Sequence, residues 1–104
     1  MQGYQLMFFT QQERSHHGKP IVKWLVDVAR EMALPGVTVI PASEGFGHHR
    51  VLHSVHFFEL ADQPVVVVMA LSEVDSERLM ARLQAEKLSI FYTKMPIEFG
   101  FLGA

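Results

Sequence analysis

The chain has 104 residues, 49% of them hydrophobic and 19% charged, and a formal net charge of -2. This length suits a single core, so we treat residues 1–104 as one domain. The charge balance offers no basic surface for a phosphate backbone, so nucleic acid is not an expected partner. Cysteine is absent, which excludes disulfides, thiolate metal sites and cysteine nucleophiles and fits a cytoplasmic location. The longest aliphatic run, residues 65–71, is far shorter than the ~20 residues of a membrane span, so we expect no membrane insertion.

The first half of the chain predicts a strand, a helix and a second strand. Aromatic and apolar residues fill positions 4–10, and the polar stretch 11–18 predicts a loop after that strand. Pro20 suits the first turn of a helix, which we expect to end at the Leu-Pro-Gly of residues 34–36. Residues 37–40 begin the second strand. The helix carries apolar residues spaced three and four apart: Ile21, Val22, Leu25, Val26, Ala29 and Met32.

The second half repeats the pattern. Residues 65–71 are apolar at every position, which predicts a strand buried on both faces. Ser72 can cap the next helix together with Asp75, and residues 88–94 lead into a last strand before an apolar tail. The order β-α-β-β-α-β is typical of the ferredoxin-like fold, an α+β class with an antiparallel sheet and two helices on one face.

The strand patterns also predict self-assembly. A sheet with helices on one face should alternate apolar and polar residues, but residues 6–9 and 65–71 do not. We therefore expect other subunits to cover the second face. In the alternative, the tail with Phe99, Phe101 and Leu102 folds back over the sheet.

Four of the six histidines lie between residues 48 and 56. Metal binding needs ligands that converge on one point. If residues 52–60 are extended, His53 and His56 point to opposite faces, and the neighbours His48 and His49 also diverge. A metal site would then need donors from more than one subunit, with His16 or His17 as further ligands. Solvent-exposed loop histidines are the other interpretation.

The histidines do not belong to any enzyme motif that we recognise. The sequence has no Gly-x-Ser-x-Gly elbow and no His-Glu-x-x-His helix, so we do not expect an enzyme. A hydrolase that uses His53 or His56 with a carboxylate is a third alternative. A different kind of site is indicated by the Gly-Phe-Gly motif at Gly45, Phe46 and Gly47. Two glycines around one residue let the backbone approach a ligand closely, and their amide groups can bind an anion.

At this point the sequence resembles a known family. Residues 36–47, "GVTVIPASEGFG", resemble the segment that leads into the T-loop of PII nitrogen-regulatory signalling proteins. The likeness is closer still to a PII-like family of bacterial and archaeal proteins of unassigned function, and it runs from Tyr4 to Phe99. Shorter shared motifs are "GKP" at 18–20, "LHS" at 52–54, "EL" at 59–60 and "PVVV" at 64–67.

The resemblance implies a homotrimer with ligand clefts between subunits, at the base of a T-loop between the second and third strands. PII proteins bind adenine nucleotides there, and the loop then engages a membrane transporter or an enzyme. Carried over to this sequence, the ligand-binding residues are Thr38, Gly45, Phe46, Gly47, His48, His49 and Arg50. After Gly47 the chain has "HHRV", without the glutamine and lysine of PII, so a smaller nucleotide or another anion is an equal expectation.

Together these features predict a non-enzymatic regulatory or sensor protein. It would bind a small ligand, such as an adenine nucleotide, in a cleft between subunits. The alternative is a metal-binding or metal-tolerance protein similar to the CutA proteins, with His48, His49, His53 and His56 as the metal ligands.

Overall fold

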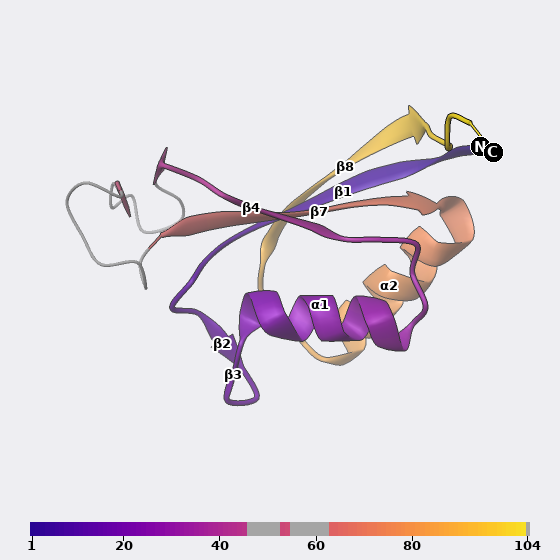
Figure 1. Cartoon of the computed structure of the whole chain (residues 1–104). Coiled ribbons are helices and arrows are strands. Elements are labelled where there is room, and N and C mark those ends of the chain that lie inside the picture. Colours follow the sequence, from indigo (N-terminus) through magenta and orange to yellow (C-terminus); the bar gives the residue numbers. More distant parts are fainter. Residues whose placement is uncertain (46–52, 55–62, 104) are drawn as a thin grey trace.

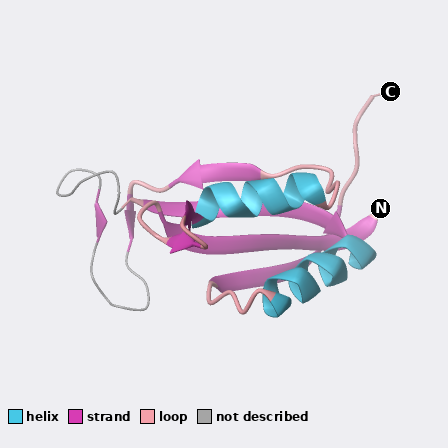
Figure 2. Cartoon of the chain, turned by 90° about the horizontal axis from the view of Figure 1, so that it is seen from below, coloured by secondary structure: helices cyan, strands magenta, loops and turns pink. Residues whose placement is uncertain are grey.

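A computed structural model of the chain describes residues 1–45, 53–54 and 63–103. It contains a four-stranded antiparallel sheet in the order β4-β7-β1-β8, with two helices against one face (Figure 1). Seen from the helix side, both helices lie over the sheet and run roughly along its strands (Figure 2). The strands are β1 (Gln2–Gln11), β4 (Thr38–Pro41), β7 (Pro64–Ser72) and β8 (Phe91–Glu98), and the helices are α1 (Ile21–Glu31) and α2 (Glu73–Ala85). This arrangement confirms the predicted ferredoxin-like, α+β fold.

Two further pairs of short strands lie outside the four-stranded sheet. β5 (Glu44–Gly45) pairs with β6 (His53–Ser54) in the long connection between β4 and β7. β2 (Ser15–His16) pairs with β3 (Lys19–Pro20) around a two-residue turn in which His17 and Gly18 both have positive φ, 53° and 75°. Two positive values identify a type I′ turn, the kind that favours tight hairpins. The prediction of a plain loop at 11–18 was therefore wrong, because a hairpin occupies its second half.

Helix α1 starts one residue later than predicted, and its buried face overlaps the predicted stripe at Ile21, Leu25 and Ala29. Pro20 precedes the helix as its N-cap residue. Trp24 and Val28 are buried although the predicted stripe omitted them, whereas Val22 and Val26 are only half-buried. The buried face is therefore rotated slightly from the predicted stripe, toward Trp24 and Val28.

Both helices end in the same way. The N–H of Leu34 donates to the Ala29 carbonyl at 2.9 Å, and the N–H of Ala33 donates to the Arg30 carbonyl at 3.0 Å. Ala33 has a φ of 56°, which completes a Schellman motif, and Lys87 has the same φ after α2. The helix therefore ends at Glu31, before the expected Leu-Pro-Gly, because Ala33 makes the left-handed turn that glycine usually makes.

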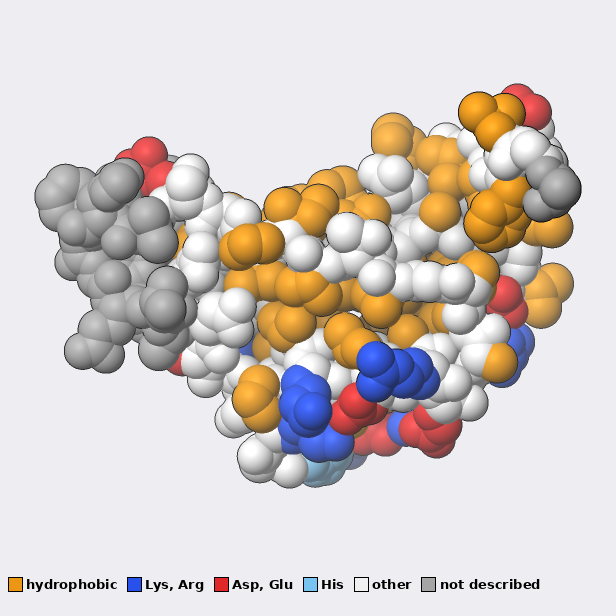
Figure 3. Space-filling model, viewed as in Figure 1, with side chains coloured by type: hydrophobic (Ala, Val, Ile, Leu, Met, Phe, Trp, Pro, Cys, Tyr) orange, Lys and Arg blue, Asp and Glu red, His pale blue; other side chains and the backbone are white. Residues whose placement is uncertain are grey.

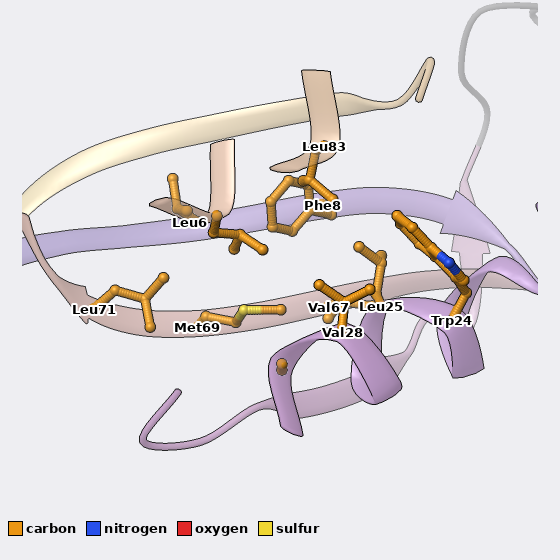
Figure 4. Close-up of a cluster of buried hydrophobic side chains, with 11 residues drawn as sticks. Leu6, Phe8, Trp24, Leu25, Val28, Val67, Met69, Leu71 and Leu83 are labelled. Carbon is orange, nitrogen blue, oxygen red and sulfur yellow. The ribbon is translucent and has the colours of Figure 1, made fainter. Parts of the chain in front are cut away.

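The core lies between the sheet and the helices. β1 and β7 contribute alternate residues, which is the period of a strand with one face toward a helix layer. Figure 4 shows these side chains meeting those of α1 and α2. The buried cluster consists of Leu6, Phe8, Trp24, Leu25, Val28, Ala29, Val67, Met69, Leu71, Leu79 and Leu83.

The other face of the sheet is apolar and open in a single chain. The register pairs Phe9 with Val66 and with Phe91, so these side chains share the face opposite to the helices. Phe9 is 36% exposed and Phe91 69%. Met95 and Ile40 extend the same face and are also exposed. Hydrophobic side chains over the sheet are visible in Figure 3.

The carboxyl-terminal segment differs from the predicted tail. Residues 95–98 belong to β8, which pairs with β1 as far as Gln2 and Glu98. Pro96 is tolerated because β8 is an edge strand. Phe101 and Leu102 are fully exposed, so the alternative in which the tail folds back over the sheet is wrong for these two residues. Phe99 is half-buried, and its ring lies near Gly3 of β1. Among the described residues, neither helix is long and apolar enough to cross a membrane.

Candidate ligand-binding site at one end of the sheet

A hollow lies at the end of the sheet where the long connection leaves β4 and returns to β7. β1 ends here, with Gln11 opposite Pro64, and β8 begins here, with Phe91 opposite Phe9. Residues of β1, β5, β7 and β8 and of the connections between the strands line the hollow. Its volume is about 1280 Å³, above the ~300–1,000 Å³ of ordinary ligand pockets. Because the hollow is wider than an ordinary ligand pocket, we describe it as one wall of a larger cleft.

Gly45 forms part of this wall. It lies in β5, opposite His53 of β6. A Cβ atom built at this position would meet only Pro64, at 3.7 Å, which is an ordinary contact, and Gly45 is not among the glycines with positive φ. Neither the packing nor the backbone conformation of the described chain therefore requires a glycine here.

Arg14 supplies positive charge to the same wall. Its Nη2 donates to the carbonyl of Ser89 at 2.7 Å, and its own carbonyl accepts the N–H of Ile21 at 2.9 Å. Arg14 and Ser89 both line the hollow. The sequence interpretation missed Arg14, because its polar surroundings predicted only a loop. Glu13 and Glu44 also line the hollow.

The predicted site residues divide into three groups. Gly45 lines the hollow, as expected of a pocket entry. Thr38 is exposed in the edge strand β4 and is not part of the hollow's lining, so its role stays a prediction. Phe46, Gly47, His48, His49 and Arg50 lie outside the described residues, as does His56, and of His53 only the backbone is described.

A second group of polar side chains lies on the helix side of the molecule. His16 and His17 of the β2–β3 hairpin meet Glu86, the C-cap residue of α2. The Nε2 atoms lie 3.4 and 3.0 Å from the same carboxylate oxygen, Oε1. Hydrogen bonds from His17 and then from His16 lower the pKa of the Glu86 carboxyl from its ordinary value. Of the described residues, these three form the one group of nitrogen and carboxylate donors close enough to share a metal ion.

Comparison with known proteins assigns the family. The family model DUF190, described as "Uncharacterized ACR, COG1993", matches residues 3–97. The chain belongs to the DUF190 family. A relative of this DUF190 chain by sequence is the UPF0166 protein of Aquifex aeolicus (strain VF5), which is 32% identical over 82 residues, 78% of each chain.

Solved structures similar to this DUF190 chain are PII-like. A PII-like signalling protein from Thermus thermophilus has a TM-score of 0.69 at 17% identity, over 93% of this chain and 88% of its own. CPII, a nitrogen regulatory PII-like protein from Thiomonas intermedia K12, has a TM-score of 0.71 at 18% identity, over 97% and 91% of the two chains. The CPII structure holds ADP, AMP and bicarbonate. The predicted fold, which these PII-like proteins share, is thus confirmed.

Proposed function

We propose that this DUF190 chain is a non-enzymatic regulatory or sensor protein that binds an adenine nucleotide in a cleft between subunits. The observation that carries the proposal is Gly45, a glycine in the wall of the hollow that the described chain does not require. A glycine is expected where a ligand or a second chain must approach the backbone closely. The similar CPII fold holds ADP and AMP, which favours a nucleotide as that ligand.

The lining of the hollow suits two parts of a nucleotide. Phe9, Ile90 and Phe91 provide apolar surface on which a base can lie. The guanidinium of Arg14, fixed by Ser89, can donate to phosphate oxygens through its remaining N–H groups. Arg14 is therefore the side chain of the lining that we expect to meet the phosphates. In the same proposal, Thr38 and residues 46–50 contribute the contacts that the family resemblance assigns to them.

The test compares two glycine variants. Gly36→Ala is the control, because a Cβ at Gly36 meets nothing within 4 Å and its φ is not positive. Melting temperatures of the wild type and both variants are measured with and without ADP or AMP. A ligand at 100 times its dissociation constant stabilises the native state by about 2.7 kcal/mol, and this shift should appear in the wild type and in Gly36→Ala. Gly45→Ala should melt like the wild type without nucleotide and lose the shift.

Two results would contradict the proposal. One is the absence of any nucleotide effect on the wild type in its assembled form. The other is a full nucleotide shift in Gly45→Ala, which would mean that the glycine does not face the ligand. Arg14→Gln sharpens the result, because losing a charged hydrogen bond to phosphate should weaken ADP binding more than adenosine binding.

We also infer that the subunits assemble as a homotrimer through the open face and the edge strands of the sheet. Phe91, Met95 and Ile40 expose apolar surface on this face, and β4 and β8 leave strand edges unpaired within the described chain. Such a patch is larger than scattered surface hydrophobics would give, and a second copy of the same chain is the occupant that is always present. Assembly would supply the missing wall of the hollow.

Sedimentation equilibrium tests the assembly. Met95→Lys places a charge on the open face and should shift the protein toward monomers. Leu102→Lys is the matched control, because Leu102 is fully exposed in the segment after β8. Equal assembly of Met95→Lys and wild type would exclude this face as the interface. Engagement of a transporter or an enzyme through the loop, and a cytoplasmic location, stay predictions.

A further inference from the structure

The hairpin and α2 bring three metal-binding side chains together within one subunit. The type I′ turn at His17 folds this residue back beside His16, and the centroids of the two rings are 4.2 Å apart. Neighbouring histidines in an extended strand would diverge, so the turn is what allows both rings to face Glu86. The Nε2 atoms and the carboxylate oxygen all lie within 4.8 Å of one another.

The two separations between Glu86 and the histidines are close to the edge length of a tetrahedral metal site. Zinc lies about 2.0–2.1 Å from nitrogen and oxygen ligands, so neighbouring ligand atoms of a tetrahedron lie about 3.3–3.4 Å apart. Glu86 Oε1 lies 3.4 Å from His16 Nε2 and 3.0 Å from His17 Nε2. Two imidazoles and one carboxylate form a donor set that zinc uses in proteins, with a fourth position for water or another ligand.

Other side chains hold two of the three donors in place. The ring of His16 packs edge-on against Trp24 of α1 at 4.4 Å between centroids, and its side chain is only 15% exposed. The Nε of Arg82 lies 3.5 Å from Glu86 Oε2, so Oε1 is the carboxylate oxygen left for the histidines. Contacts of this kind fix the direction of a metal ligand before the metal binds. Figure 3 shows histidine surface beside acidic and basic side chains at the lower edge of the molecule.

We propose that His16, His17 and Glu86 bind a divalent transition-metal ion, with Zn²⁺ the ion that this geometry fits best. The site is separate from the sheet-end hollow and uses none of the histidines at positions 48–56. It needs one subunit only, so it does not rest on the proposed trimer. Imidazole donors select transition metals over Mg²⁺ and Ca²⁺, which prefer oxygen ligands.

The experiment titrates the metal-free full-length chain with Zn²⁺ by calorimetry. One Zn²⁺ per subunit should bind at this site in the wild type. His17→Ala and Glu86→Gln should each raise the dissociation constant at least about tenfold, the least effect expected even for loss of a supporting residue. His17 is 69% exposed, so its replacement should leave the chain folded without metal and lower the melting temperature only slightly, through the lost hydrogen bond to Glu86. The double variant His48→Ala and His49→Ala is the control and should keep the site.

A second readout locates the ion. Trp24 is the only tryptophan of the sequence and its ring contacts His16, so Cu²⁺ bound at the site should quench its fluorescence. His17→Ala should abolish this quenching at a Cu²⁺ concentration that saturates the wild type. The proposal is overturned if the wild type binds no Zn²⁺, if His17→Ala and Glu86→Gln bind it like the wild type, or if only the His48 and His49 variant loses it. Gly45→Ala should keep Zn²⁺ binding, so this result is independent of the nucleotide proposal.

Discussion

Phe8 and Phe9 are neighbours in β1, yet they lie on faces of the sheet with different roles. Phe8 points toward the helices and is completely buried, whereas Phe9 points away from them and is 36% exposed. The same alternation continues in β7, where Val67 is buried and Val66 is half-buried. One face is covered by α1 and α2, and the other is open in the described chain. The unbroken apolar run therefore supplies the core on one face and, in the proposal above, the contact with other subunits on the other.

The largest expected effect comes from comparing Phe8→Ala with Phe9→Ala. Truncating the buried ring should lower the free energy of unfolding by about 3–5 kcal/mol. Phe9→Ala should cost about 1 kcal/mol, chiefly through its ring contact with Phe91 at 5.6 Å between centroids. Urea unfolding in the monomeric Met95→Lys background measures both, since assembly would otherwise add to the second value. Equal costs would mean that the two faces do not differ in the way described.

Gly3→Ala tests the one end of the open face that the described chain covers by itself. A Cβ at this position would collide with the backbone carbonyl of Leu71 and lie 2.6 Å from the Phe99 ring. The strands would have to separate, and we expect a loss of about 2–3 kcal/mol, measured by urea unfolding. Gly36→Ala, in open space, is the control. A neutral Gly3→Ala would show that Phe99 and β7 can move apart easily.

Ala33→Gly probes the helix-covered side and should stabilise the protein. An L-residue in the left-handed region costs about 1–2 kcal/mol, from which the greater freedom of glycine in the unfolded chain subtracts part. We expect a net gain of about 0.5–1 kcal/mol. Ala81→Gly, at an exposed position within α2, should instead lose about 1 kcal/mol. A loss in both variants would indicate that Ala33 has contacts worth more than its backbone strain.

The smallest expected effect concerns the ion pair between the β2–β3 hairpin and α1. Lys19 Nζ donates to Asp27 Oδ2 at 2.7 Å, and this hydrogen bond lowers the Asp27 pKa from its ordinary value of 3.8. The stabilisation is complete above the ordinary pKa and is lost as pH falls through the lowered one. Asp27→Asn should therefore lower the melting temperature slightly at neutral pH, and the difference from the wild type should vanish in acid. A difference that persists in acid would assign the effect to something other than the charge.

Much of the fold followed from local pattern. The apolar runs predicted strands, and the spacing of three and four predicted α1. Ser72 caps α2 by accepting the Asp75 N–H at 3.1 Å, as its sequence suggests. The errors lie where contact with another element decides. In α1, Trp24 and Val28 are buried although they lie outside the predicted stripe. At the carboxyl-terminal end, residues 95–98 pair with β1 and so belong to β8. The His17-Gly18 turn was readable in principle, because a residue followed by glycine between two extended pairs favours a type I′ turn.

The candidate sites were predictable to different degrees. Gly45 was found from the Gly-Phe-Gly motif, and it does line the hollow. The residues around Arg14 in the sequence did not indicate a binding site. Its side chain is held by the carbonyl of Ser89, which lies 75 residues away in the sequence. The interpretation of the histidines centred on positions 48–56, whereas the described donors that converge are His16 and His17.

By itself, the sequence determined the order of strands and helices, the family resemblance and the surplus of apolar residues on the sheet, since these depend on composition and on spacing along the chain. Tertiary structure alone decided which residues meet across long separations. Glu86 reaches His17 from 69 residues away because a hairpin after β1 and the end of α2 lie side by side. Spacing along a chain sets which side of an element is apolar, but the packing of elements against one another decides which polar side chains share a site.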